Sequence, residues 1–581
     1  MEKEESKQII VDREVPCTVR DGVKLYANIY RPNDAGAYPV LLCRLPYNKN
    51  LSDFSHRYID PIRTAINGFV VIIQDVRGRF ASEGEFEPFV QESTDGYDTV
   101  EWAADLPYSN GKVGMFGLSY YGFTQLYASL EKPPSLKAIF PAMTGSIYSE
   151  AFNKGGVFQF AAAETWILDS IAPDYLKRKQ DTSTYAESMK EIISDLDQIE
   201  EWHDYKPINQ WPPVMKHPEL RELFTKHITK EHITETLSKE KLTSANLTIP
   251  AFHLAGWYDN FLGSTIMNYE DMKKTDDNQK MIIGPWAHGM FHSEIGERSF
   301  GVNSSGSSID GEDDLTSLHI KWFDYWLKHD HTSLSNNDDP VQIFVMGINQ
   351  WRSEKEWPLN RAIMTPFYFH SDGHANTNLE SGTLTTVPPA EKQTDQFIHD
   401  PENPVPTNGG GVLFYNGRNA GPRDQSEIET RNDVVVYTSQ PMDTPLEVTG
   451  WIKVVLWAAT DAPDTDFTAK LVDVDVLPDG TAYNLTEGIV RASFANKENE
   501  QENLKDKVVK YEIDLWATSN VFLPGHKIRI EIASSNYPWY DVNPNTGKTT
   551  LDTTVMVKAT QTILHDSEHP SHVVLPVIPG E

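Results

Sequence analysis

Cysteine is nearly absent from this 581-residue sequence, which contains only Cys17 and Cys43. Two thiols in so long a chain indicate a reducing compartment, and they do not form the closely spaced pairs of a zinc site. No run of roughly eighteen apolar residues occurs, which argues against a membrane-spanning helix. The first residues, MEKEESKQ, lead into no apolar signal segment, so we expect a cytoplasmic protein.

Basic residues are also few. The chain has 51 Lys and Arg against 84 Asp and Glu, a formal net charge of −33. A polyanion repels phosphate backbones and anionic lipid, so neither a nucleic acid nor a membrane surface is expected as a partner. The hydrophobic share of 39% is that of an ordinary globular protein, and the length predicts about two to four domains.

Near-continuous apolar runs of strand length alternate with helical stretches in two parts of the chain. The runs are residues 39–43 (PVLLC), 69–74 (FVVIIQ), 113–116, 249–255 (IPAFHLA) and 280–283. Such runs are typical of strands that are buried on both faces of a parallel sheet. We therefore predict an α/β domain that comprises residues 1–144 and 241–350.

The other two parts follow different patterns. Residues 145–240 contain charged, amphipathic stretches such as 187–201, which predict an inserted helical cap. After residue 350 the chain is rich in turns and short β-type runs, including 434–438, 451–458 and 527–533. Residues 351–581 are therefore predicted to form an all-β sandwich or jelly roll.

The sharpest local signal is Gly117-Leu-Ser119-Tyr-Tyr-Gly122, which lies between a predicted strand and a predicted helix. A nucleophile elbow needs this context, because a strained strand-to-helix turn lifts the serine hydroxyl above the sheet. Gly122 stands one place later than in the usual Gly-x-Ser-x-Gly pattern. A strand, a glycine-rich turn and a helix are also common without any catalytic role.

Two further candidates follow later strands in the chain order that α/β-hydrolases use, which is serine, acid, histidine. Asp259 follows the run IPAFHLA in Gly256-Trp-Tyr-Asp-Asn260, and His288 follows KMII in Gly284-Pro-Trp-Ala-His288. Taken singly, Asp259 could be a turn cap and His288 could bond a neighbouring carbonyl. Three candidates in this order at three strand ends favour a Ser119–His288–Asp259 triad.

These residues resemble the cocaine esterase / X-prolyl dipeptidyl-peptidase superfamily of serine hydrolases (CocE/NonD type), and the cocaine esterase branch most closely. The resemblance extends over essentially the whole chain, and the family elbow, Gly-x-Ser-Tyr-x-Gly, accounts for Gly122. Further motifs that carry it are Arg44-Leu-Pro-Tyr-Asn-Lys49, Asp75-Val-Arg-Gly-Arg79, Ser82-Glu-Gly84, Gly256 to Phe261, Pro404-Val-Pro-Thr407, Val412-Leu-Phe414 and Asp464-Thr-Asp-Phe467.

The resemblance implies an α/β-hydrolase domain with an inserted helical cap and a C-terminal jelly roll. It implies an oxyanion hole formed by the Tyr47 hydroxyl and the Tyr120 backbone N–H. It also implies an apolar acyl pocket that includes Trp166, Phe261, Leu413 and Phe414, although plain core packing would explain these four residues equally well. Related acylases that prefer α-amino acyl groups carry acids just after the triad aspartate, where this chain has Phe261 and Leu262.

The expected function is hydrolysis of small-molecule carboxylic esters with an apolar or aromatic acyl group, without a cofactor or a metal. A homodimer is compatible with the sequence. The alternatives are an X-prolyl dipeptidyl aminopeptidase or an amide or β-lactam acylase with the same triad, and a carbohydrate-binding jelly-roll protein with an inactive hydrolase domain. Asp473-Val-Asp475 loosely resembles a calcium loop but lacks its remaining ligands. For Arg77, a structural ion pair is favoured over a substrate clamp.

Overall fold

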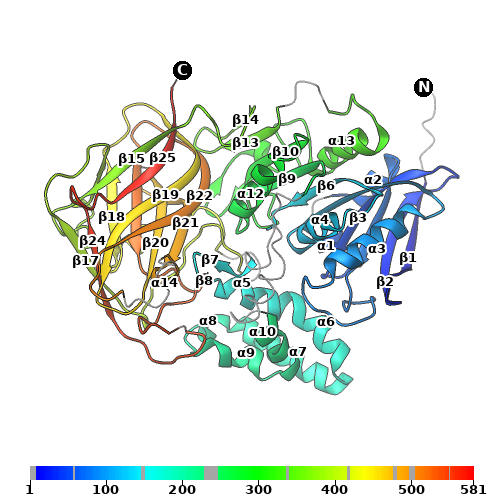
Figure 1. Cartoon of the computed structure of the whole chain (residues 1–581), viewed down its shortest axis with the longest axis horizontal. Coiled ribbons are helices and arrows are strands. Elements are labelled where there is room, and N and C mark those ends of the chain that lie inside the picture. The colour runs from blue at the N-terminus through cyan, green and yellow to red at the C-terminus, as the bar shows by residue number, and fades with distance from the viewer. Residues whose placement is uncertain are drawn as a thin grey trace.

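The computed structural model describes residues 8–56, 59–145, 151–227, 247–334, 339–414, 419–475, 480–495, 504–548 and 550–580. These ranges form an α/β part, a helical part and a C-terminal all-β part, which lie on three sides of a common centre (Figure 1). The fold class predicted from the sequence is thereby confirmed. Across the described ranges, none of the helices is long and apolar enough to cross a bilayer.

The α/β part is built on a ten-stranded sheet in the described ranges, in the order β1-β2-β4-β3-β5-β6-β9-β10-β13-β14. Neighbours from β4 to β13 are parallel, whereas β1, β2 and β14 pair antiparallel at the edges. The strands are β1 Ile9–Thr18, β2 Lys24–Pro32, β3 Tyr38–Leu45, β4 Val70–Asp75, β5 Ser109–Leu118, β6 Leu136–Ala142, β9 Ala251–Tyr258, β10 Gln279–Ala287, β13 Val341–Val345 and β14 Gln350–Glu354.

Both faces of this sheet are covered, which explains the continuous apolar runs in its sequence. Every residue of β4 and β9 is buried. The helices of this part are α1 Ser52–Ser55, α2 Pro61–Ile66, α3 Glu92–Ala104, α4 Tyr120–Leu130, α12 Leu262–Lys273 and α13 Leu315–Lys328. Because β14 pairs with β13, the sheet continues to Glu354, past the boundary predicted at residue 350.

The helical cap follows β6. It begins with a short hairpin and continues through six α-helices and one π-helical turn in the described ranges. These elements are β7 Asn153–Lys154, β8 Val157–Phe158, α5 Phe160–Thr165, the π turn η2 Trp166–Ile171, α6 Ala172–Lys179, α7 Thr182–Asp197, α8 Ile199–Trp202, α9 Pro212–Met215 and α10 Pro218–His227. The end of the cap, predicted at residue 240, lies outside the described residues.

The C-terminal part is all β. Its strands form one continuous ladder in the order β17-β24-β19-β25-β15-β16-β18-β23-β20-β21, and β22 pairs with β19. They are β15 Ile363–His370, β16 Thr383–Thr385, β17 Thr394–His399, β18 Val435–Ser439, β19 Leu446–Thr460, β20 Asp466–Val474, β21 Ala482–Arg491, β22 Val509–Phe522, β23 Lys527–Ala533, β24 Ala559–Leu564 and β25 His572–Ile578.

Two of these strands are longer than the short runs expected from the sequence. β19 has 15 residues and β22 has 14. Their pairing shifts register between Trp451 and Lys453, and Trp516 in β22 has a positive φ of 61°. Such a bulge bends a strand, so β19 can pair with β22 along one edge and with β24 and β25 along the other.

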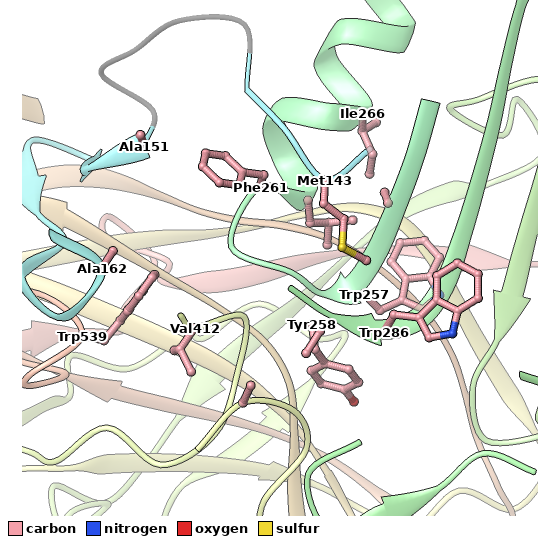
Figure 2. Close-up of a cluster of buried hydrophobic side chains, with 14 of the residues drawn as sticks. Met143, Ala151, Ala162, Trp257, Tyr258, Phe261, Ile266, Trp286, Val412 and Trp539 are labelled. Carbon is pink, nitrogen blue, oxygen red and sulfur yellow. The ribbon is translucent and has the colours of Figure 1, made fainter. Parts of the chain in front are cut away.

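One apolar cluster joins all three parts of the chain. Figure 2 shows this region, where Ala162 of the cap, Tyr258 at the end of β9 and Val412 of the β part surround the same centre. Trp257 and Trp286 enter it from the adjacent strands β9 and β10. The junction of the three parts is therefore packed as a core, which gives any cavity formed there firm walls.

Candidate active site

Ser119 lies at the sharp turn between β5 and α4. Its backbone has φ 58° and ψ −125°, a conformation that side-chain-bearing residues rarely adopt. The strain is held by hydrogen bonds on both sides, because the Ser119 N–H donates to Ala142 O (3.0 Å) and its carbonyl accepts from Gly122 N (2.7 Å). This is the geometry of a nucleophile elbow.

The two glycines of the elbow are required by close contacts. A Cβ on Gly117, which has φ 155°, would lie 2.3 Å from the Tyr121 carbonyl oxygen. A Cβ on Gly122 would lie 2.5 Å from Cβ of Thr144, the residue whose hydroxyl donates to Ser119 O over 3.0 Å. The displaced glycine of the motif therefore gives α4 room to pack against the segment that supports the serine carbonyl.

Asp259 and His288 each follow a strand directly. Tyr258 of β9 and Ala287 of β10 are paired in register, so the next residue of each strand emerges at the same sheet edge. The His288 Nδ1 and Asp259 Oδ1 atoms are 2.7 Å apart, and the two side chains are 7% and 0% exposed. A buried carboxylate on Nδ1 leaves Nε2 as the nitrogen that faces a substrate.

Ser119 and His288 both line a cavity of about 940 Å³ between the sheet edge, the cap and the β part. Tyr47, which follows β3, lines the same cavity. Three strands of the sheet thus place a hydroxyl, an imidazole and a phenol around one space, as expected where parallel strands end together. The other aromatic and apolar residues of the wall are Phe54, Ile59, Leu118, Tyr121, Trp166, Met290, Phe291, Leu413, Leu315 and Phe414.

The Tyr47 hydroxyl accepts a hydrogen bond from Nε1 of Trp166 over 3.2 Å. The Tyr47 ring also stacks on Phe54 with 4.9 Å between ring centroids. An accepted hydrogen bond makes a hydroxyl a better donor, because hydrogen bonds in series polarise each other. Trp166 of the cap therefore helps to orient the phenol of Tyr47, which follows a strand of the sheet.

Tyr120 is not among the residues that line the cavity, and its side chain is buried in a polar network. Its hydroxyl donates to Oε1 of Glu92 (2.9 Å), and the other Glu92 oxygen accepts from Nη1 of Arg44 (2.8 Å). Burial raises the pKa of Glu92 and raises that of the Tyr120 phenol well above its usual value. This buried network anchors the first residue of α4, whose N–H is the expected oxyanion donor.

The four residues predicted to form an acyl pocket have different positions. Trp166, Leu413 and Phe414 line the cavity, but Phe261 does not. Phe261 is 4% exposed, and its ring lies 5.6 Å from the imidazole of His288 and 5.8 Å from Phe123, between centroids. Phe261 therefore packs beside the histidine ring, because the turn into α12 directs it away from the cavity.

Three charged residues of the other motifs make structural contacts. Nζ of Lys49 lies 2.7 Å from Asp75, and both side chains are fully buried. Arg79 is fully buried as well, and it donates to the carbonyls of Pro46, Ser170 and Ile171 at 2.9 to 3.1 Å, which ties the cap to the loop after β3. These charges hold the loop that carries Tyr47 and the π turn that begins at Trp166.

Arg77 pairs with Asp95 and Asp21, so the interpretation as a structural ion pair agrees with the geometry. In the loosely calcium-like segment, Asp473 accepts from Nδ1 of His526 (2.8 Å). Residues 476–479 lie outside the described residues. In the part of the chain that is described, no group of three or more His, Cys, Asp or Glu side chains is placed to hold a metal ion.

Most of the wall residues were missed by the sequence reasoning, and Phe54, Tyr121 and Asp169 are three examples. Tyr121 is part of the elbow motif and could have been inferred from it. Phe54 lies in the four-residue helix α1, and Asp169 in the π turn η2. Neither element is long enough to show a periodic pattern, so the sequence carries no signal for them.

The sheet order, the elbow and the cavity at the carboxyl ends of the strands define an α/β-hydrolase. Residues 21–290 match the X-Pro dipeptidyl-peptidase family (S15 family), and residues 335–574 match the X-Pro dipeptidyl-peptidase C-terminal non-catalytic domain. The chain is 36% identical over 569 residues to cocaine esterase of Rhodococcus sp. (strain MB1 Bresler), an alignment that includes 96% of this chain and 97% of that protein.

Solved structures show the same fold. An aminopeptidase from the marine sediment archaeon Thaumarchaeota archaeon matches with a TM-score of 0.74 and 24% identity, over 100% of this chain and 98% of that one. An α-amino acid ester hydrolase matches with a TM-score of 0.71 and 22% identity, over 99% and 98%. The chain belongs to the S15 family of serine hydrolases, in its CocE/NonD-type group, and it is an ester hydrolase.

Proposed function

We propose that this protein cleaves small-molecule carboxylic esters through an acyl-enzyme, with Ser119 as nucleophile, His288 as base and Asp259 as its partner. The observation that carries the proposal is the 2.7 Å contact between Asp259 and His288 at the edge of a cavity that Ser119 also lines. Buried aspartate, histidine and a serine at a strained elbow are the elements of a nucleophilic triad.

In the proposed reaction His288 Nε2 takes the proton of Ser119 as the serine oxygen attacks the ester carbonyl. Asp259 keeps the proton of the imidazole on Nδ1 and stabilises the imidazolium that forms. His288 then protonates the departing alcohol. Water enters, gives its proton to His288 and attacks the acyl-enzyme, which releases the acid and restores Ser119.

The negative oxygen of each tetrahedral intermediate would be bound by the Tyr47 hydroxyl and the Tyr120 N–H. Two observations support this assignment. The hydroxyl of Tyr47 is oriented by Trp166, and Tyr120 is the first residue of α4, where the backbone N–H groups of a helix are directed outward. A donor that is already in place stabilises developing charge without reorganisation.

The acyl group is proposed to be apolar or aromatic. Trp166, Leu413 and Phe414 supply apolar surface from the cap and the β part, and Phe54 and Phe291 add more from the α/β part. Phe261 and Leu262 follow Asp259, where an acid would be needed to hold an α-ammonium group in the acyl moiety. The proposal therefore excludes α-amino acyl esters as preferred substrates.

Labelling with a fluorophosphonate probe tests the nucleophile. We expect one phosphonyl group on Ser119 in the peptide map, and no labelling of Ser119→Ala. A label on another residue would refute the assignment. Parallel assays with an aryl ester and a glycyl-prolyl anilide test the reaction class, since dominant anilide cleavage would instead favour an X-prolyl dipeptidyl aminopeptidase.

A further inference from the structure

Asp169 is a carboxylate on the wall of the substrate cavity that is not used in holding the fold. It lies in the π turn η2, three residues after Trp166, and its side chain is open to the cavity whereas Ile167 and Leu168 are buried. Among the described residues, neither a hydrogen-bond donor nor a cation pairs with it. Burial by the surrounding protein raises the pKa of Asp169.

The other acids on this wall are placed differently. Asp60 accepts from the N–H groups of Ile62 and Arg63 and so caps α2. Asp314 pairs with the Arg63 guanidinium and caps α13. Asp53 lies in α1 with an exposed side chain. Asp169 thus differs from Asp60 and Asp314 in having no structural task. Asp169 and Asp53 are both exposed, but Asp169 lies in the cap beside Trp166, whereas Asp53 lies in α1 of the α/β part.

Within the described ranges, neither Lys nor Arg lines the cavity. The histidines on the wall are His56, His288 and His292, and burial lowers the pKa of His56, so that its imidazole is uncharged at neutral pH. The cavity therefore has a negative potential, which attracts a cation and repels a carboxylate.

The same wall is rich in aromatic rings, with Tyr47, Phe54, Trp166, Phe291 and Phe414 all lining the cavity. Aromatic faces attract alkylated ammonium groups, which combine a positive charge with apolar surface. A site with a carboxylate and several aromatic rings therefore favours an alkylated ammonium group. A neutral polar group would gain much less from it, because it has no charge to pair with the carboxylate.

We propose that Asp169 is a specificity-determining residue that holds a cationic nitrogen of the substrate, so that the preferred esters carry an alkylated ammonium group away from the reacting carbonyl. This inference rests on the proposed function, because it places the ester at Ser119. Arg79 strengthens it, since its bonds to the carbonyls of Ser170 and Ile171 fix the backbone beside Asp169. A carboxylate held in place loses little freedom on binding.

The test compares two esters of the same shape and different charge, butyrylcholine and 3,3-dimethylbutyl butyrate, in which a carbon replaces the quaternary nitrogen. The quaternary charge does not depend on pH, so titration of the ligand does not enter. Release of butyrate is followed for the wild type, Asp169→Asn and the matched control Asp53→Asn. Binding of benzyltrimethylammonium, followed by calorimetry, is a second readout that does not depend on catalysis.

We expect the wild type to have the higher kcat/KM for the charged ester. Asp169→Asn should lower the ratio of charged to neutral kcat/KM by about 10- to 100-fold and weaken benzyltrimethylammonium binding by a similar factor. Asp53→Asn should leave the ratio within about twofold, because Asp53 lies in α1 and not in the π turn of the cap that begins at Trp166. Thermal unfolding of each variant shows that the fold is kept.

Three outcomes would overturn the inference: no preference of the wild type for the charged ester, a preference that survives in Asp169→Asn, or an equal loss in both variants, which would indicate a diffuse field. Failure of the proposed function is a separate result. It would show as no hydrolysis of either ester or of an aryl ester, and the calorimetric comparison would then still decide the role of Asp169.

Discussion

Trp166 of the cap donates its indole N–H to the hydroxyl of Tyr47, which follows a strand of the sheet, over 3.2 Å. One hydrogen bond thus links the residue expected to contact the acyl group to the residue expected to stabilise the oxyanion. Arg79 holds both ends of this link, through the carbonyls of Pro46 and Ile171. We therefore expect cap packing and oxyanion stabilisation to be coupled in this protein.

Removal of the phenol hydroxyl should reduce catalysis more than binding. Tyr47→Phe keeps the ring on Phe54 but lacks the proposed oxyanion donor, so kcat should fall by about 10²–10³ with a small change in KM. Trp166→Phe removes the indole donor and part of the ring but keeps the Tyr47 hydroxyl, so it should lower kcat less. Steady-state kinetics with an aryl ester checks both. A Tyr47→Phe enzyme with wild-type kcat would show that another group binds the oxyanion.

Replacement of the proposed nucleophile should abolish turnover and leave the fold intact. The Ser119 side chain makes no capping hydrogen bond to α4, and alanine has the same Cβ in the same strained backbone conformation. We expect Ser119→Ala to lose about 10⁴-fold or more of the esterase rate, with stability within about 1 kcal/mol of the wild type. Ester hydrolysis and urea unfolding are the two measurements. A variant that retained a tenth of the activity would place the nucleophile elsewhere.

For Gly122→Ala, helix propensity and side-chain packing predict changes in stability of opposite sign. Helix propensity alone predicts that Gly122→Ala stabilises α4 by about 1 kcal/mol. The added Cβ would lie 2.5 Å from Thr144, so we instead expect destabilisation by about 1–3 kcal/mol. Activity should fall as well, because Thr144 supports the carbonyl of Ser119. Denaturant unfolding decides the sign, and a stabilised variant would contradict the packing seen here.

Stability should decrease in acid partly through His319. Burial lowers the pKa of this histidine from 6.5 to about 3, and its ring stacks on Phe140 with 3.7 Å between centroids. Below pH 6.5 the unfolded chain binds a proton that the folded chain does not. The stability that depends on a neutral His319 is therefore fully present above pH 6.5. As the pH falls toward 3 the free energy of unfolding decreases, by about 2 kcal/mol at pH 5.

The replacement His319→Phe should remove that part of the pH dependence, because phenylalanine keeps the stacked ring and does not titrate. Urea unfolding at pH 7.5 and pH 5 gives the difference in free energy of unfolding for wild type and variant. His331→Phe is the matched control, since the His331 side chain is exposed. An unchanged pH dependence in His319→Phe would show that other groups cause the acid loss.

Local patterns were enough to predict the strands and turns that carry the proposed triad. Continuous apolar runs indicated the parallel strands, and the residues just after three of them were Ser119, Asp259 and His288. Strands and elbows are short-range features, because burial on both faces and a tight turn each restrict the residue types at neighbouring positions. The family resemblance added the cap, the β domain and the roles expected for Tyr47 and Tyr120.

Only the tertiary structure decided which side chains share the cavity. Phe261 follows the aspartate in sequence but packs beside the imidazole, whereas Asp169, Phe54 and Tyr121 form part of the wall. These residues come from the cap and from loops, and their directions depend on contacts between segments far apart in the chain. A cavity is the space left when separate elements pack together, and no local pattern of residues encodes that space.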